Sequence, residues 1–212
     1  MEHSPRLGLS FLLPVSRRLF ARHILLRRFR KADAAELLAL WQNNREWLSS
    51  GMSPLPDGFS EPDMQLEIRK RQRLEQKGRR LDLAICDQTD QQCLGEVSIH
   101  SLSWGIQLSG GLGFWIDQDF ASRGLMKEAV ATACSFAFEE SPLHRIWAAS
   151  TLQNTSSQRV LKALGFKQDG TLRQELFLEG RWQDMLHFSL LRDEYDQLAE
   201  TWIKSGFLGS SP

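Results

Sequence analysis

Hydrophobic residues recur along most of the chain with the spacing of either a strand or a helix. The run from Phe20 to Phe29 carries β-branched and aromatic residues, which predicts a strand. Asp33 is the expected N-cap of the next run, in which apolar residues from Ala34 to Trp41 follow a helical period. The ordered part of the chain is therefore expected to begin with a strand and a helix.

A loop and a charged helix are expected next. The segment 43–59 is rich in Asn, Ser, Gly and Pro, as loops are. Ser60 and Asp63 form a capping pattern, which predicts a second helix reaching about Lys77. We interpret the Arg and Lys residues of this helix as a solvated face, with a partner-binding patch as the alternative.

The middle of the chain reads as strands followed by a crossover. Segments 81–86, 94–102 and 112–116 have strand composition and predict a three-stranded meander. Helical spacing over 124–139 then leads to a further strand at 145–150. Such a crossover makes the flanking strands parallel, and the crossover connection is normally right-handed.

The last third predicts a short helix at 156–164 and a hairpin of 170–178 with 185–191, turning at Glu179-Gly180. A final helix is expected from about 192 to 204.

Length and the absence of repeats favour one domain. A chain of 212 residues can bury a hydrophobic core of its own. We predict a loose N-terminal arm over residues 1–16, a single α/β domain over 17–205 and a tail over 206–212.

Composition excludes several classes of function. Lys plus Arg and Asp plus Glu both total 26, so the basic excess of a protein that binds nucleic acid directly is missing. No stretch approaches the roughly 20 apolar residues of a membrane-spanning helix, which predicts a soluble protein.

The spacing of the cysteines and histidines does not predict a metal site. Cys86, Cys93 and Cys134 are odd in number and lack the CxxC spacing, so neither a disulfide framework nor a zinc knuckle is expected, and a reducing cytoplasm fits best. The five histidines show no pair at helical metal-ligand spacing.

The segment 117–129 joins a strand end to a helix start through a glycine. Backbone N–H groups at such a helix start favour phosphate oxygens. Gly124 lets the backbone approach a phosphate closely, and Arg123 adds a positive charge beside it. The alternative is that this glycine is only structural.

This segment resembles the pyrophosphate loop of the GCN5-related N-acetyltransferases (GNAT), which reads Gln or Arg, two residues, Gly, one residue, then Gly or Ala. The sequence has Ala121, Gly124 and Met126 at those three places. Gly-Leu-Met followed by Glu-Ala resembles the branch that includes the ribosomal-protein alanine N-acetyltransferases.

Further segments carry the same resemblance. Asn154 to Phe166 resembles the family's Asn-x-x-Ser segment and its helix ending in Gly-Phe. Segments 170–175, 180–184 and 23–28 resemble the alanine N-acetyltransferase branch, and the whole resemblance spans about residues 17–195.

The resemblance implies the GNAT fold and a site for acetyl-CoA. It implies a mixed central sheet of about seven strands, splayed between the fourth and fifth strands and flanked by about four to five helices. The residues that it implies for coenzyme binding are Phe114, Trp115 and Ile116 along the pantetheine, Ser122, Arg123, Gly124, Leu125 and Met126 around the pyrophosphate, and Asn154 and Ser157 beyond them.

Amine acetylation needs a base, and two carboxylates are candidates. Glu96 alternates onto one strand face with Ser98 and His100, a polar stripe that either lines a site or faces bulk solvent. Glu175 is implied by the resemblance, although the match is uncertain by one position, which leaves Leu176 as its alternative.

The third catalytic candidate is Ser157, whose hydroxyl the resemblance places near the thioester sulfur, where it would protonate the departing thiolate. Its alternative role is to cap the following helix, for which Thr155 and Ser156 compete. Cys134 lies inside a helix and is expected to be buried and inert, so the resemblance implies direct transfer without an acetyl-enzyme.

The sequence thus predicts an acetyl-CoA-dependent N-acetyltransferase. A protein α-amine, with a pKa of about 7.7 to 8.0, needs only modest help from a base, and the favoured acceptor is a protein N-terminus of the ribosomal-alanine type. A polyamine, aminoglycoside or amino-sugar acceptor is the alternative, and a coenzyme A-binding regulatory module without turnover is a third. The chain is expected to act as a monomer or homodimer.

Overall fold

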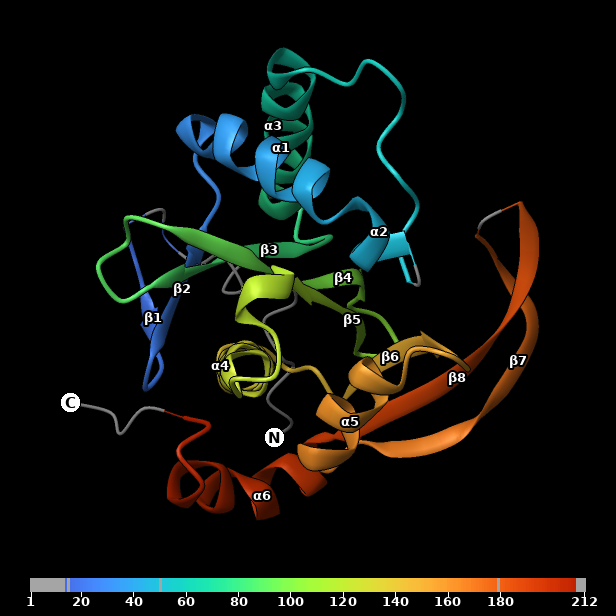
Figure 1. Cartoon of the computed structure of the whole chain (residues 1–212). Helices are drawn as coiled ribbons and strands as arrows, with labels where there is room; N and C mark the ends of the chain where they lie inside the picture. The colour runs from blue at the N-terminus through green and yellow to red at the C-terminus, as the bar shows by residue number, and fades with distance from the viewer. Residues whose placement is uncertain (1–13, 15, 50, 179, 209–212) are drawn as a thin grey trace.

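The computed structural model describes residue 14 and residues 16–49, 51–178 and 180–208. Most of the predicted arm over 1–16, the end of the predicted tail and one residue of the predicted hairpin turn lie outside the described residues. The described part is built around one sheet with helices on both faces (Figure 1).

The sheet has eight strands in the described part of the chain, in the order β1-β2-β3-β4-β5-β6-β8-β7. They are β1 (Leu19–Phe20), β2 (Ile24–Arg28), β3 (Leu81–Asp87), β4 (Cys93–Ser103), β5 (Ser109–Ile116), β6 (Arg145–Thr151), β7 (Lys167–Leu178) and β8 (Arg181–Leu191). Neighbouring strands are antiparallel except β5 and β6, which are parallel. The predicted meander, crossover and hairpin are confirmed.

Six α-helices accompany the sheet in the described residues. They are α1 (Ala34–Asn43), α2 (Arg45–Ser49), α3 (Glu61–Gln76), α4 (Leu125–Glu139), α5 (Thr155–Ala163) and α6 (Arg192–Lys204). The Ser60 N–H donates to the Asp63 carboxylate at 2.9 Å, which confirms the predicted cap of α3.

One strand and one helix exceed the sequence-based estimate. The run predicted as a single strand from Phe20 forms two, since β1 folds back on β2 with Leu19 opposite Leu26. The segment predicted as a loop over 43–59 contains α2, whose five residues are too few to show a helical period.

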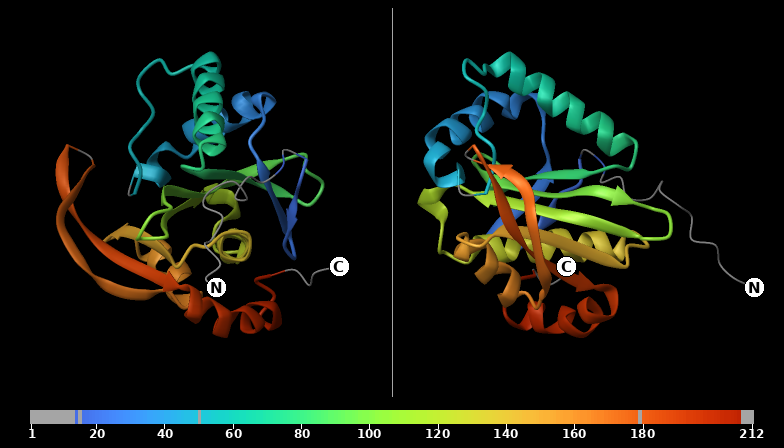
Figure 2. Two further views of the ribbon diagram at one scale, coloured as in Figure 1. Left: turned by 180° about the vertical axis from the view of Figure 1, so that it is seen from behind. Right: turned by 90° about the vertical axis from the view of Figure 1, so that its right-hand side faces the viewer.

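The two faces of the sheet bury different cores. On one face β4 presents Val97 and Ile99 to α4, and α6 packs beyond that helix. On the other face α1 and α3 cover the strands from β2 to β4 (Figures 1 and 2). Because β-strand side chains alternate between faces, Glu96 and Ser98 lie on the side of α1 and α3.

The sheet opens between β5 and β6. Their paired register starts at Ser109 with Arg145 and ends at Gly111 with Trp147, although both strands continue for several residues. This is the predicted splay, and the additional strand β1 makes it fall between the fifth and sixth strands of the chain. We call the last paired register, Gly111 with Trp147, the vertex of the splay.

Candidate active site

The backbone of β5 faces the opening beyond the vertex. The Asp117 N–H donates to the Leu94 carbonyl of β4 at 2.8 Å. Because N–H and C=O groups alternate between the two sides of a strand, Phe114 and Ile116 direct theirs away from β4 and into the opening. Trp115 directs its backbone towards β4, opposite Glu96, and its buried ring packs edge-on against Trp41.

Helix α2 closes one end of this opening. The indole Nε1 of Trp47 donates to the Ile116 carbonyl at 3.1 Å, at the end of β5. Just before α2, the buried Asn44 accepts a hydrogen bond from the Gln118 N–H at 2.9 Å. These two contacts hold α2 beside the strand end, a role that its short sequence did not indicate.

The loop between β5 and α4 has the shape of an anion site. Ser122 and Gly124 adopt left-handed backbone angles, with φ of 61° and 85°. Gly124 precedes α4 directly, and a Cβ built there would meet no atom within 4 Å. The first N–H groups of α4, on Leu125 and Met126, therefore open onto free space at the positive end of the helix dipole.

The Arg123 side chain lies along the same loop. Its guanidinium donates to the Asp119 carbonyl at 2.6 Å and lies 5.1 Å from the centre of the Phe120 ring. A positive charge is thus held beside the left-handed residues, where it favours an anion. The loop as a whole has the geometry of an anion-binding site.

Asn154 caps helix α5. Its Oδ1 accepts hydrogen bonds from the Ser157 N–H at 3.0 Å and from the Ser156 hydroxyl at 3.1 Å. The cap is thus not Ser157, Thr155 or Ser156. The half-buried Ser157 hydroxyl is left for another role. Since β5 and β6 are parallel, α5 begins at the same end of the opening as the loop before α4.

Glu96 lies beneath α3. Its carboxylate accepts a hydrogen bond from Arg71 of α3 at 2.9 Å, and the residue is only 6% exposed. Its second oxygen has no hydrogen-bond partner among the described residues. Burial raises the pKa of Glu96, although Arg71 acts in the opposite direction. The alternative that Glu96 faces bulk solvent is wrong, and we call Glu96 and Arg71 the buried pair.

Glu175 lies in a bulge of β7. Leu172 pairs with Met185 and Leu176 with Gln183, so three residues of β7 stand opposite Asp184 alone. The bulge turns the Glu175 carboxylate to His187 of β8, and Glu175 Oε2 lies 2.5 Å from His187 Nε2.

His187 continues a line of contacts across the sheet. Its ring stacks on Trp147 of β6, with centroids 6.0 Å apart and planes at 17°. Trp147 in turn meets His100 of β4 edge-on at 5.5 Å. Burial, and next the charge of Arg80, lower the pKa of His100. We call Glu175, His187, Trp147 and His100 the open row, because its two middle members, Trp147 and His187, lie on β6 and β8, over which α1 and α3 do not extend (Figure 2).

A glycine allows the open row to cross the vertex. A Cβ at position 111 would lie 2.5 Å from the His100 ring and 2.7 Å from the Trp147 ring. Gly111 therefore makes room for both rings over β5. Sequence reasoning found Glu175 but missed His187 and Trp147, because their proximity depends on pairing between distant strands.

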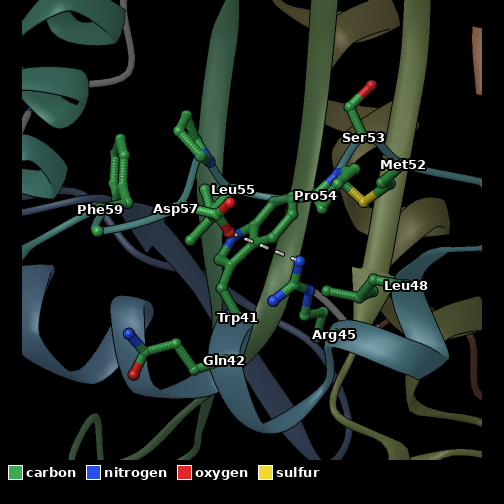
Figure 3. A pocket seen from close by; sticks show the side chains of 12 residues that line it. Trp41, Gln42, Arg45, Leu48, Met52, Ser53, Pro54, Leu55, Asp57 and Phe59 are labelled. Atoms are coloured by element: carbon green, nitrogen blue, oxygen red, sulfur yellow. Dashed lines mark ion pairs between the residues drawn. The ribbon is translucent and has the colours of Figure 1, made fainter. Parts of the chain in front are cut away.

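A separate hollow lies between α1, α2 and the segment leading to α3 (Figure 3). Arg45 and Asp57 face each other across it at 4.0 Å, and Trp41 forms part of its wall. Trp41 also touches Trp115, so the hollow adjoins the same face of the sheet as the buried pair.

In residues 14, 16–49, 51–178 and 180–208 no three His, Cys, Asp or Glu side chains gather as a metal site would require. None of the helices within those ranges is long and apolar enough to cross a membrane.

Known proteins share this fold and sequence pattern. Residues 23–167 match the family model described as the acetyltransferase (GNAT) domain, which covers more than half of the chain. "Probable N-acetyltransferase YjcK" of Bacillus subtilis is 28% identical over 78% of this chain and 92% of its own length. The [Ribosomal protein uS5]-alanine N-acetyltransferase of Escherichia coli is 24% identical over 79% of this chain and 87% of its own.

A solved structure agrees in fold. RimJ of Mycobacterium smegmatis, in complex with CoA-disulfide, superposes with a TM-score of 0.81 at 24% identity and covers 90% of this chain and 93% of its own. The chain belongs to the GNAT acetyltransferase family. It is an acetyl-CoA-dependent N-acetyltransferase, as the sequence predicted.

Proposed function

We propose that the protein acetylates the N-terminal α-amine of a protein. The observation that carries this proposal is the chemistry of the open row, which is aromatic and holds one carboxylate, Glu175, already paired with His187. A polyamine carries several positive charges and calls for several free carboxylates. An α-amine loses its proton at a pKa of about 7.7 to 8.0, so a single weak base suffices.

A relative that is similar over most of its length favours the same class of acceptor. The Escherichia coli relative is named for the alanine of a ribosomal protein, and its similarity extends over most of both chains. We infer that the acceptor of this protein is likewise a protein N-terminus that begins with a small residue.

In this proposal the coenzyme lies along β5, with its pyrophosphate at the start of α4. The N–H groups of Leu125 and Met126, with the left-handed Ser122 and Gly124, would bind the pyrophosphate. The backbone of Phe114 and Ile116 would pair with the pantetheine amides, as one strand pairs with another. Arg123 would add charge at the phosphates, and Trp115 would support β5 from the side of α1.

Two residues of α5 complete the site. Asn154 would hold the start of α5 in place through its cap, and it brings Ser157 to the opening. The Ser157 hydroxyl, free of that cap, would donate its hydrogen to the thiolate that leaves. Acetyl-CoA supplies the activated acetyl group, and the thioester needs no covalent enzyme intermediate.

The test is acetyl-CoA consumption, followed by thiol release, against peptides that differ only at their first residue. We expect turnover with Ala- and Ser-starting peptides and none when the same peptides carry a blocked N-terminus. Internal lysines kept in both peptides serve as the control for side-chain acetylation. Turnover with polyamines or aminoglycosides alone would disprove this acceptor class and leave the coenzyme site standing.

A further inference from the structure

The open row places a histidine, which the sequence did not single out, beside the vertex of the splay. His187 pairs across the sheet with Ala149 of β6, two residues past the vertex residue Trp147. Its neighbours on β8, Leu186 and Phe188, pack into the core on the side of α4. Strand alternation therefore directs His187 to the opposite face, over which an acceptor can approach.

The partner of His187 fixes its protonation pattern. A carboxylate only accepts hydrogen bonds, so the ring nitrogen that Glu175 binds, Nε2, must carry the hydrogen. The other nitrogen, Nδ1, then keeps its lone pair in the neutral ring. The His187 side chain is 19% exposed, so the ring is held by its neighbours yet remains within reach of a small polar group.

The contacts around His187 also orient its ring. Trp147 stacks on one side of the imidazole, and the β7 bulge at Gln174, with a φ of 50°, brings Glu175 to its edge. The Gln174 N–H donates to Asp184 at 2.9 Å, which holds the bulge in this shape. Bulges beside active sites commonly re-aim a side chain in this way.

We propose that His187 is the general base of acetyl transfer and that Glu175 is its positioning residue. This inference rests on the proposed transfer to an amine. Nδ1 of His187 accepts a proton from the ammonium group of the acceptor, directly or through one water. The amine lone pair then forms the C–N bond as the C–S bond breaks. The electron pair of the C–S bond leaves on sulfur. A second proton passes from nitrogen to that sulfur by way of the Ser157 hydroxyl, which gives its hydrogen to sulfur and takes one from nitrogen. His187 then returns its own proton to solvent.

The kinetic test replaces the ring and keeps its size and polarity. His187→Gln is expected to lower kcat by about 100-fold or more, as loss of a general base does, with the KM for acetyl-CoA changed less than about twofold. His144→Gln is the matched control, because His144 is an exposed histidine just before β6. The kcat of this variant is expected to stay within about twofold of wild type. Added imidazole should restore part of the activity of His187→Ala.

Thermal unfolding of each variant separates loss of the base from loss of the fold. A His187→Gln variant that unfolds like the wild type and retains a kcat within about threefold would overturn the proposal. So would a change in the KM for acetyl-CoA with kcat preserved, since that would make His187 a binding residue.

A second measurement needs no acceptor. Nitrogen NMR of the histidine rings reports which nitrogen carries hydrogen, and His187→Gln identifies the signal. We expect hydrogen on Nε2 in the wild-type protein and a mixture of the two forms in Glu175→Leu, which cannot accept a hydrogen bond. Hydrogen on Nδ1 in the wild type, or an unchanged signal in Glu175→Leu, would contradict the proposal even if the acceptor is not a protein N-terminus.

Discussion

The buried pair and the open row hold the same kind of carboxylate in opposite settings. Glu96 is covered by α3 and bound to Arg71, a guanidinium that does not release its proton. Glu175 lies on an uncovered part of the same face and binds Nε2 of His187, an imidazole whose second nitrogen is left to accept a proton. The two glutamates thus differ in their partner and in their cover, and under our proposal only Glu175 serves proton transfer, through His187.

The largest expected effect is on stability and concerns the buried pair. Arg71→Met would leave the Glu96 carboxylate buried without a counter-charge, which costs about 3–5 kcal/mol. Arg71→Met combined with Glu96→Leu removes both charges and should recover most of that loss. Urea unfolding at pH 7 measures the stability of the wild type, of Arg71→Met and of the double variant. If Arg71→Met were as stable as the wild type, Arg71 would not compensate the charge of Glu96.

The next effect concerns the packing of the open row. Gly111→Ala would place a methyl group against the His100 and Trp147 rings, and such overpacking costs about 1–3 kcal/mol. It should also lower kcat, because Trp147 would shift away from His187. Gly105→Ala is the control, since a Cβ there meets no atom within 4 Å. Equal kcat in the two variants would show that Trp147 does not orient His187.

Much of the framework could be predicted from the sequence, because it depends on local patterns. The two-residue period of β4 correctly placed Glu96 and Ser98 on one face. Gly124 marked the start of α4, and the charged helix was found from its cap at Ser60. The same patterns could not show that α3 lies over Glu96, since that depends on packing between segments far apart in the chain.

Other features of the site could not be predicted from the sequence, for different physical reasons. The β7 bulge breaks strand alternation, so the face of Glu175 could not be read from its position in the strand. Ser122 has a left-handed backbone without being a glycine, which no sequence pattern indicates. His187 is a lone histidine in a strand, and only the pairing of β7, β8 and β6 gives it partners.

A smaller effect distinguishes the two glutamates by activity. Glu175→Gln is expected to lower kcat about tenfold, equivalent to about 1.4 kcal/mol, because the amide orients the ring of His187 less strictly. Glu96→Gln should keep kcat within about threefold. Steady-state rates on the best peptide, compared at equal folded fraction, measure both. A larger loss in Glu96→Gln than in Glu175→Gln would reverse the assignment and make the buried pair the catalytic one.

The smallest effect is a difference in the pH dependence of stability between two carboxylates, those of Glu96 and Asp90. Burial raises the pKa of Glu96 despite Arg71. Burial acts in the same direction on Asp90, but hydrogen bonds from Arg27, Arg18 and Arg30 outweigh it and hold the pKa of that carboxyl well below its usual value. The two groups should therefore contribute to stability over different pH ranges.

The direction of each change in stability follows from the pH range in which the unfolded and the folded protein release the proton. The unfolded chain releases the Glu96 proton near pH 4.3 while the folded protein still holds it, so the stability of wild type relative to Glu96→Gln should fall as pH rises above that value. Relative to Asp90→Asn, the wild type should keep a constant advantage above about pH 5 and lose it as pH falls towards the lowered pKa. Each change is on the order of 1 kcal/mol, measurable by urea unfolding from pH 3.5 to 7.5. A wild-type advantage over Glu96→Gln that grew with pH would mean that Arg71 outweighs burial, and Glu96 would then be an ordinary stabilising ion pair.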